Sequence, residues 1–165
     1  MITLNFDQAF DRIVGHEGGY VDGAKIGDPG GETKFGISKR SYPALNIKEL
    51  DVGTAKAIYR KDFWEPLGDN CHPSIKFQAF DFAVNSGINT ALRKLQQAIG
   101  VADDGNFGPI SRARLAEFAP SDVLLLYLAK RLEFMASLSI WPEFGRGWAR
   151  RIAKNLNYSA IDNEV

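Results

Sequence analysis

The chain has 165 residues, a length that fits one domain with a core of its own or one domain with a small added lobe. It carries 20 basic and 20 acidic side chains, so its formal net charge of zero offers no electrostatic argument for nucleic acid as a partner. One cysteine excludes an intramolecular disulfide, and only two histidines accompany it for a zinc site. We therefore expect no nucleic acid partner, no metal and no other cofactor.

The N-terminal sequence MITLNFDQAF has neither the basic start nor the apolar core of a signal peptide. The longest apolar run, residues 123–129, is far too short to cross a bilayer. These features predict a soluble protein that is made in the cytoplasm and does not insert stably in a membrane. No repeat or linker composition divides the chain, and a monomer is the default expectation.

A helix is predicted at the start of the chain. Side chains recur there at steps of three and four, as on one face of a helix: Phe6, Phe10, Ile13, Val14 and Glu17. Asn5 suits the N-cap of this helix, and Gly18 and Gly19 suit its end. A loop rich in Gly, Asp and Pro follows over residues 18–36, and the turn signal Asp22-Gly23 allows a small hairpin within it.

Helical patterns fill most of the remaining chain. They cover residues 52–64, 75–85, 91–99, 110–118, 121–138 and 144–156, with Pro and Gly between them. No long alternation of period two indicates a large sheet. The predicted fold is mainly α with one irregular loop after the first helix, and a long loop in a compact domain is often functional.

Glu17 is a candidate general acid at the start of this loop. It lies four residues after Ile13 and seven after Phe10, so it continues the apolar stripe of the first helix. Burial of a carboxyl group there would raise its pKa and keep it protonated near neutral pH, as an acid catalyst requires. The alternative is a Glu that binds neighbouring backbone in the last helical turn, where its charge opposes the helix dipole.

Asp28 and Thr33 form a second candidate cluster. Pro29 favours an extended Asp28, while Gly30 and Gly31 allow a tight turn or a close approach of the backbone to a ligand. A carboxylate and a hydroxyl on such a turn could orient one water molecule, although Asp28 could also bind its own downstream backbone in an Asx-turn. Combined with a buried acid at the mouth of the same loop, the cluster indicates a hydrolase that uses two carboxylates.

Several segments carry a family resemblance: EGGYVDGAKIGDPGGETKFGIS, the helix with Phe63-Trp64, FDFAVNSGINTALRKLQQAIGVADDGNFGPIS and the closing FGRGWARRI. They resemble glycoside hydrolase family 108, muramidases of the lysozyme-like superfamily that are common as bacteriophage endolysins. The resemblance implies a lysozyme-like, mainly α fold with a catalytic region over residues 1–90. Residues 91–165 resemble the family's peptidoglycan-binding C-terminal region, packed on the first region or continuous with it in one domain.

The resemblance also implies roles for residues of the loop. Glu17 matches the family's catalytic Glu, and Asp28 and Thr33 match the Glu–Asp–Thr set of phage-type lysozymes. The gap from Glu17 to Asp28 is longer than in the well-known phage lysozymes, so Asp22 stays a rival for the second carboxylate. The implied reaction is hydrolysis of the β-1,4 bond between N-acetylmuramic acid and N-acetylglucosamine in peptidoglycan. Inversion is the preferred stereochemistry, because an Asp/Thr pair suits the positioning of water.

Two more residues are candidates for contact with the sugar. Tyr20 could stack on a sugar ring, although an aromatic side chain beside a turn more often packs against the protein. Asn85 lies four residues after Asp81 on a predicted helix and could bind the sugar, or it could cap that helix before Gly87. Closer to the C-terminus lie four basic residues that form either a solvated face or a contact with an anionic wall: Arg146, Arg150, Arg151 and Lys154.

Two metal-site patterns are incomplete. His16-Glu17 begins like the zinc motif HExxH, but Tyr20 replaces the second histidine, which disfavours a zinc peptidase or amidase. The segment DDGN, residues 103–106, begins like a calcium loop but has no Glu at the twelfth position. We interpret it as a turn before the next helix.

Two other functions stay open at this point. A lytic transglycosylase would act on the same bond with a Glu acid/base and release an anhydro-sugar. A non-enzymatic wall-binding or virion protein would keep the fold and release no reducing ends. The endolysin resemblance further implies action on the wall, in the periplasm, after a separate membrane-permeabilising partner has opened the inner membrane.

Overall fold

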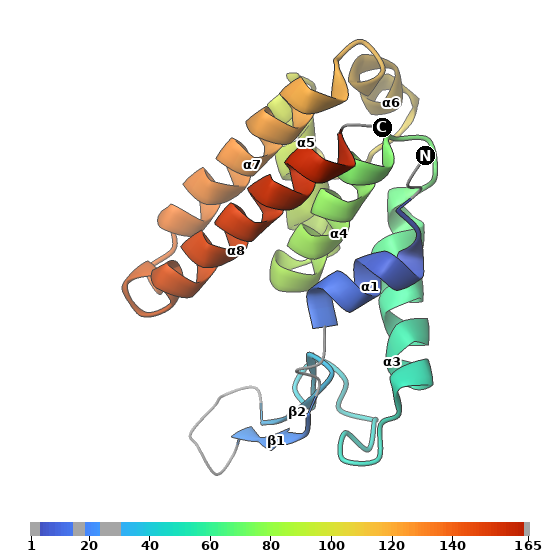
Figure 1. Ribbon diagram of the computed structural model, residues 1–165, viewed down its shortest axis with the longest axis vertical. Coiled ribbons are helices and arrows are strands. Elements are labelled where there is room, and N and C mark those ends of the chain that lie inside the picture. Colours follow the sequence, from blue (N-terminus) through green and yellow to red (C-terminus); the bar gives the residue numbers. More distant parts are fainter. Residues whose placement is uncertain (1–3, 15–18, 24–30, 164–165) are drawn as a thin grey trace. The chain divides into compact units, whose positions relative to one another are not determined.

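The computed structural model describes residues 4–14, 19–23 and 31–163 (Figure 1). The chain divides into two compact units, an N-terminal unit over Asn5–Asp62 and a helical unit that joins Phe63–Val165 with Met1–Leu4. The predicted mainly α architecture, with a small sheet after the first helix, is confirmed. The predicted boundary between regions near residue 90 stays a prediction.

The first helix of the N-terminal unit, α1, covers Phe6–Val14. Its start is closed by a reciprocal cap, in which the backbone N–H of Gln8 donates to Asn5 Oδ1 and the backbone N–H of Asn5 donates to Gln8 Oε1, both at 3.0 Å. This arrangement satisfies two of the donors that a helix start leaves unpaired. The predicted N-cap is therefore confirmed, whereas the predicted end of the helix near Gly18 lies outside the described residues.

Helix α3, Val52–Tyr59, is the partner of α1 within this unit. The ring of Phe10 meets the ring of Tyr59 edge to face, with 5.3 Å between centroids. At the surface of the same contact, Lys56 pairs with Asp7 at 2.8 Å. Buried aromatic pairs of this geometry add specificity to the apolar contact, so α1 is tied to α3 along the face that the sequence pattern predicted.

A three-stranded antiparallel sheet lies between these helices in the chain. It consists of β1 (Val21–Asp22), β2 (Glu32–Lys34) and β3 (Ile37–Ser38), with β2 in the middle. The predicted turn at Asp22-Gly23 is wrong, because Asp22 pairs with Glu32 and Gly23 N–H continues the ladder to the carbonyl of Gly31 at 3.1 Å. The tight turn is instead at residues 35–36, between β2 and β3.

The chain changes helix type after Tyr59. A π-helical turn, η1 (Arg60–Trp64), and a 3₁₀ turn, η2 (Glu65–Leu67), follow α3 directly. The sequence pattern predicted one helix through residue 64. Pro66 cannot donate a backbone hydrogen bond, and its ring restricts the residue before it, so a regular helix does not continue past this point.

The described part of the helical unit contains five α-helices: α4 (Pro73–Ser86), α5 (Ile88–Ile99), α6 (Pro109–Leu115), α7 (Pro120–Ala136) and α8 (Trp141–Asp162). Each predicted pattern in this region corresponds to one of them. The largest difference between a predicted and an observed helix end is at α8, which ends six residues beyond the predicted residue 156. In these last turns the ring of Tyr158 meets the ring of Phe77 on α4, and Ser159 Oγ accepts a hydrogen bond from Gln78 Nε2 at 3.2 Å. Tertiary contacts of this kind extend a helix beyond its local sequence signal.

Helix α4 is the centre of the helical unit and packs against α5, α7 and α8 (Figure 1). Every residue from Ser74 to Ala83 is buried. A helix that is covered on all sides must also bury its polar residues, which here are Ser74, Lys76, Gln78 and Asp81. Each of these therefore needs a partner inside the unit.

Helices α7 and α8 form a hairpin with its own apolar cluster. Leu128, Met135 and Ile152 are buried in it, with Trp141 and Trp148 packed against them. Among the described helices, none combines the length and the apolar character that crossing a membrane would require.

Candidate active site

The two carboxylates predicted to be catalytic, Glu17 and Asp28, lie outside the described residues. The structure does describe the elements on either side of them. Helix α1 is tied to Tyr59 through the ring of Phe10. The same Tyr59 donates its hydroxyl hydrogen to the carbonyl of Phe35, in the turn after β2, at 2.9 Å. One side chain of α3 thus anchors the segments that precede and follow the predicted catalytic loop.

Thr33, the third predicted catalytic residue, occupies the middle of the central strand β2. It pairs with Val21 on β1 and with Ser38 on β3. Its side chain is half-buried, and within the described part of the chain its hydroxyl makes no hydrogen bond. The backbone of Thr33 is therefore held on both sides, while its hydroxyl stays available for a water molecule or a ligand.

Tyr20, predicted to contact the sugar, is held by a residue that the sequence analysis did not single out. Its hydroxyl donates to Glu32 Oε1 at 2.7 Å, and this hydrogen bond to a carboxylate raises the pKa of Tyr20 to about 12. The phenol therefore stays protonated at neutral pH. No sequence pattern pointed to Glu32, because a strand of three residues is too short to display a period of two.

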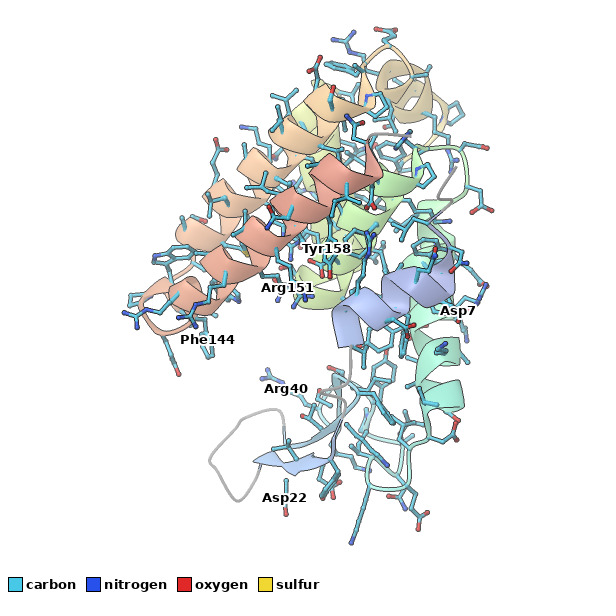
Figure 2. The ribbon with its side chains drawn as sticks, in the orientation of Figure 1. Asp7, Asp22, Arg40, Phe144, Arg151 and Tyr158 are labelled. Atoms are coloured by element: carbon cyan, nitrogen blue, oxygen red, sulfur yellow. The ribbon has the colours of Figure 1, made fainter. Side chains whose placement is uncertain are left out.

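The sheet separates the candidate side chains onto two faces. Successive residues of a strand point to opposite faces, and directly paired residues point to the same face. Asp22 therefore shares a face with its partner Glu32, and Thr33 lies on the other face with its partner Val21. Figure 2 labels Asp22 on β1, at the edge of this small sheet. Asp22 and Thr33 cannot both contact one water molecule from opposite faces of the sheet.

Asn85, the other predicted sugar contact, belongs to the helical unit. It lies half-buried in the last turn of α4, where its Oδ1 accepts a hydrogen bond from the hydroxyl of Ser86 at 3.3 Å. Asn85 does not cap the helix. The C-cap of α4 is Gly87, whose backbone N–H donates a hydrogen bond to the carbonyl of Ala83. Its role toward a sugar stays a prediction.

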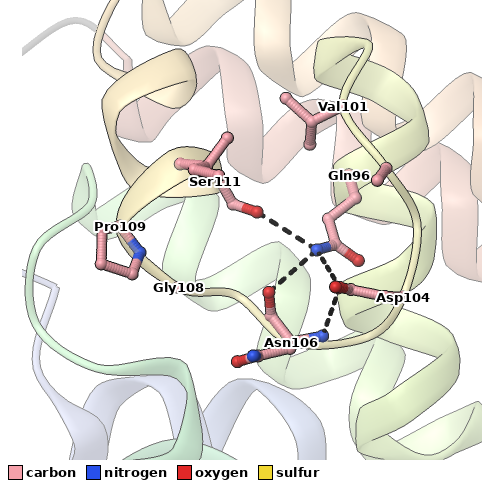
Figure 3. Close-up of a pocket in the computed structure, with 9 residues that line it drawn as sticks. Gln96, Val101, Asp104, Asn106, Gly108, Pro109 and Ser111 are labelled. Carbon is pink, nitrogen blue, oxygen red and sulfur yellow. Dashed lines mark hydrogen bonds between the residues drawn. The ribbon is translucent and has the colours of Figure 1, made fainter.

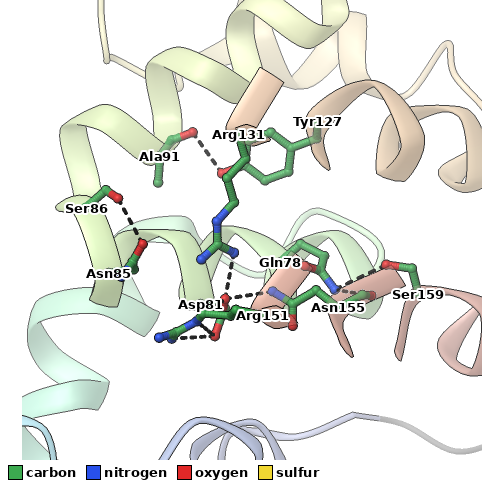
Figure 4. Close-up of polar contacts among 10 residues, drawn as sticks. All are labelled: Gln78, Asp81, Asn85, Ser86, Ala91, Tyr127, Arg131, Arg151, Asn155 and Ser159. Carbon is green, nitrogen blue, oxygen red and sulfur yellow. Dashed lines mark hydrogen bonds and ion pairs between the residues drawn. The ribbon is translucent and has the colours of Figure 1, made fainter. Parts of the chain in front are cut away.

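Asp81, one turn before Asn85, lies in a buried network of hydrogen bonds and ion pairs (Figure 4). It is 3% exposed and receives hydrogen bonds from Arg131 on α7 and from Arg151 and Asn155 on α8. Burial alone would raise its pKa, but the two guanidinium groups outweigh burial and lower the pKa to about 2. Asp81 is therefore ionised and neutralised inside the helical unit.

The basic residues near the C-terminus differ in their surroundings, since one binds a buried carboxylate and the other three face solvent. Arg151 binds Asp81 through Nε and Nη2, the latter at 2.7 Å. Arg146, Arg150 and Lys154 are exposed on α8. Among residues 4–14, 19–23 and 31–163, no group of three or more His, Cys, Asp or Glu side chains is arranged to hold a metal ion.

Residues 10–87 match the sequence profile of the family described as Glycosyl hydrolase 108. The structure is similar to that of Brucella abortus SagA, with a TM-score of 0.87, 29% sequence identity, and coverage of 97% of this chain and 96% of that one. A search of the curated proteins gives no match.

The two similarities cover different lengths of the chain. The matched residues 10–87 contain the predicted acid, the predicted loop, the sheet and helix α4. The structural similarity extends over almost the entire chain and includes all the helices of the helical unit. Residues 10–87, just under half of the chain, are therefore similar to the glycosyl hydrolase 108 family, and almost the whole chain is similar in fold to Brucella abortus SagA. These similarities support a glycosidase with a lysozyme-like, mainly α fold.

Proposed function

We propose that this protein is a muramidase, which hydrolyses the β-1,4 bond between N-acetylmuramic acid and N-acetylglucosamine in peptidoglycan. The observation that carries the proposal is the match of residues 10–87 to a glycosidase family, because this segment contains every residue that the sequence analysis selected for chemistry. Those residues are Glu17, Tyr20, Asp28, Thr33 and Asn85.

Glu17 acts as the general acid in this proposal. In the sequence it lies seven residues after Phe10 and four after Ile13, the spacing that predicts a place on the apolar stripe of the first helix. A carboxylic acid in such a position protonates the glycosidic oxygen as the bond to the leaving sugar breaks. The leaving sugar then departs as a neutral alcohol.

Asp28 is the second carboxylate, and Thr33 assists it. The two faces of the sheet support this choice over Asp22, because Asp22 is directed away from the face that carries Thr33. Asp28 and Thr33 together orient the water that attacks the anomeric carbon, and Asp28 accepts a proton from that water. This arrangement inverts the configuration, and it requires a distance between the two carboxyl groups of roughly 6.5–9.5 Å.

The first test compares the wild type with Glu17→Gln on purified peptidoglycan, by turbidity and by the masses of soluble fragments. Glutamine keeps the size of the side chain but cannot donate the proton, so we expect activity to fall by about 10²–10⁴-fold. Glu49→Gln is the matched control, because Glu49 is an exposed glutamate of the same unit whose Oε2 accepts a hydrogen bond from the Asn46 amide at 3.0 Å. Full activity of Glu17→Gln would overturn the proposal.

The fragment masses also separate hydrolysis from the transglycosylase reaction. Hydrolysis adds one water at the cleaved bond, so the wild type should release muropeptides with a reducing end. Fragments that end in an anhydro-sugar would assign the chain to the transglycosylase class. Binding to the wall with no soluble fragments would leave only a wall-binding protein.

A second pair of variants tests the assignment of the second carboxylate. Asp28→Asn should lose more activity than Asp22→Asn, since only Asp28 is proposed to contact the attacking water. Both substitutions remove one negative charge from the same loop region, so a general electrostatic effect would be equal in the two variants. The reverse ranking would transfer the role to Asp22.

The proposal also includes the place of action. The enzyme acts on the cell wall, and a separate membrane-permeabilising protein gives it access, as the endolysin resemblance implies. Lysis of cells that express the chain should then depend on co-expression of such a protein.

A further inference from the structure

A small hollow opens in the helical unit between the end of α5, the turn that follows it and the start of α6 (Figure 3). Its volume is about 170 Å³. Pockets for drug-sized ligands have volumes of about 300 Å³ or more, so this hollow is large enough for a group the size of a side chain and too small for a disaccharide. It is distinct from the predicted catalytic loop, whose residues lie in the other unit.

The floor of the hollow is rigid because one buried amide holds it together. Gln96 is 1% exposed, and its Oε1 accepts a hydrogen bond from the backbone N–H of Gly105 at 2.8 Å. Its Nε2 lies 2.9 Å from Asp104 Oδ1 and 3.1 Å from both the carbonyl of Asn106 and the hydroxyl of Ser111. The turn and the start of α6 are thus fixed before any ligand arrives.

Asp104 is the single ionisable side chain among the residues that line the hollow. Hydrogen bonds from Gln96 and from the backbone of Asn106 lower the pKa of Asp104, so it is ionised at neutral pH. Both bonds go to Oδ1, and within the described part of the chain Oδ2 makes no hydrogen bond. A negative oxygen therefore remains available to a donor in the hollow.

The neighbouring basic side chains are engaged elsewhere. Arg93 pairs with Asp103 at 3.7 Å and donates to its backbone carbonyl. Arg114 on α6 pairs with Glu117 and donates to the carbonyl of Ile99. Neither residue lines the hollow, so no side chain of the hollow neutralises Asp104.

The rim of the hollow is apolar and open to solvent. Ile110 is 80% exposed at the start of α6, and Val101 and Pro109 also line the hollow. An isolated exposed isoleucine needs no explanation by itself. Beside an unneutralised carboxylate, however, it offers a contact for the methylene groups of an amine that binds the carboxylate.

We propose that this hollow binds a primary ammonium group on a short aliphatic arm, with Asp104 as the acceptor and Ile110 against the arm. This identification rests on the proposed function, since the stem peptides of peptidoglycan carry such an amine on their diamino acid. The hollow then contacts the peptide part of the wall, while the catalytic loop contacts the glycan.

The test follows the backbone amide shifts of the full chain by NMR during titration with one muropeptide. The probe is a disaccharide, N-acetylglucosaminyl-N-acetylmuramic acid, with a tripeptide that ends in a diamino acid. It lacks the bond between N-acetylmuramic acid and a following N-acetylglucosamine, so binding is measured without hydrolysis. We expect shifts at residues 101–111, and we expect them to disappear when the side-chain amine of the probe is acetylated.

Asp104→Asn is the decisive variant, because asparagine can keep both hydrogen bonds at Oδ1 and removes only the charge. We expect about tenfold weaker binding, the effect of one charge-assisted hydrogen bond. Asp103→Asn is the control, since it removes the adjacent charge from a residue that does not line the hollow. Three outcomes would overturn the inference. They are equal binding by Asp104→Asn and the wild type, equal binding of the acetylated and the free probe, and shifts confined to other parts of the chain.

The result is independent of the test of the proposed function. Binding of the probe at residues 101–111 without hydrolysis of the wall would retain this site and reject the muramidase. Hydrolysis of the wall without these shifts would retain the muramidase and reject the site.

Discussion

At the scale of single residues, the turn after β2 shows how one side chain organises the N-terminal unit. Phe35 and Gly36 both have positive φ, 50° and 75°, as the two-residue turn of a tight hairpin requires. A phenylalanine rarely adopts this conformation. The hydrogen bond from Tyr59 to the carbonyl of Phe35 holds it there, and it also brings the Tyr59 hydroxyl against Gly36.

Gly36→Ala should therefore destabilise the protein. The new methyl group would overlap the Tyr59 hydroxyl, and alanine is strained at positive φ. We expect a loss of about 2–3 kcal/mol in the free energy of unfolding, measured by urea denaturation. Tyr59→Phe loses the hydrogen bond to Phe35, but it should cost less in the Gly36→Ala variant than in the wild type, because it also removes the oxygen that the methyl group meets.

Gly147→Ala is the control for this prediction. Gly147 lies within α8, where nothing is within 4 Å of an added methyl group. Alanine there should stabilise the protein by about 1 kcal/mol, since glycine is a poor helix former. Equal effects of the two substitutions would show that the contact with Tyr59 is unimportant.

At the scale of elements, the ion cluster around Asp81 joins three helices (Figure 4). Asp81 comes from α4, Arg131 from α7 and Arg151 from α8. Arg131 is 1% exposed, and its guanidinium group lies 4.8 Å from the centroid of the Phe82 ring. Its Nε and Nη2 have no hydrogen-bond partner among the described residues. The buried arginine therefore depends strongly on the charge of Asp81.

This dependence predicts a specific loss of stability in acid. The pKa of Asp81 is about 2 in the folded protein and 3.8 as the reference value. A carboxyl group with a lowered pKa stabilises the folded state at every pH above its reference pKa. This contribution to the free energy of unfolding is lost as the pH falls from about 4 to about 2. It amounts to about 2 kcal/mol, and thermal unfolding followed by circular dichroism across this range measures it.

Asp81→Asn tests the origin of this loss. It leaves buried positive charge without its counterion, which should cost about 3–5 kcal/mol at neutral pH. The variant should also lose less stability than the wild type between pH 4 and pH 2, because the titrating group is gone. Asp11→Asn, at an exposed position of α1, should change neither quantity. A wild type whose stability is constant over this pH range would contradict the prediction.

At the scale of the whole molecule, the zero net charge conceals a local concentration of positive charge. Arg146, Arg150 and Lys154 follow one another at steps of four along the exposed face of α8. None of the three forms an ion pair within the described part of the chain, whereas Lys130, Arg93 and Arg114 do. Figure 2 shows Phe144 at the end of the α7–α8 hairpin where this basic face begins.

Replacing Arg146, Arg150 and Lys154 with Gln should reduce binding to purified anionic wall in a pelleting assay at low salt. The difference from the wild type should shrink in 1 M salt, where the Debye length is only about 3 Å. The control replaces Lys130, Arg93 and Arg114 with Gln, which makes the same change in net charge at ion-paired positions. Equal losses in the two variants would assign the effect to net charge and leave the α8 face a solvated surface.

The elements that could be predicted from the sequence are those with strong local signals. The apolar repeat and the Asn5 cap located α1, and Pro and Gly bounded the later helices within a few residues. Strands of two or three residues have no detectable period, so the sheet was anticipated only as a hairpin and its turn was misplaced. Glu32 was missed for the same reason, since its contact with Tyr20 exists only after β1 and β2 have paired.

The sequence by itself determined the mainly α class, the resemblance to a glycoside hydrolase family and the selection of Glu17, Asp28 and Thr33 as candidates. These depend on residues close together in the chain. Tertiary structure alone decided that Asp22 and Thr33 lie on opposite faces of a sheet. It also decided that Arg151 serves Asp81 while Arg146 and Arg150 face solvent. The physical reason is that pairing between strands and burial between helices join residues 10 to 77 positions apart, and no local pattern records such contacts.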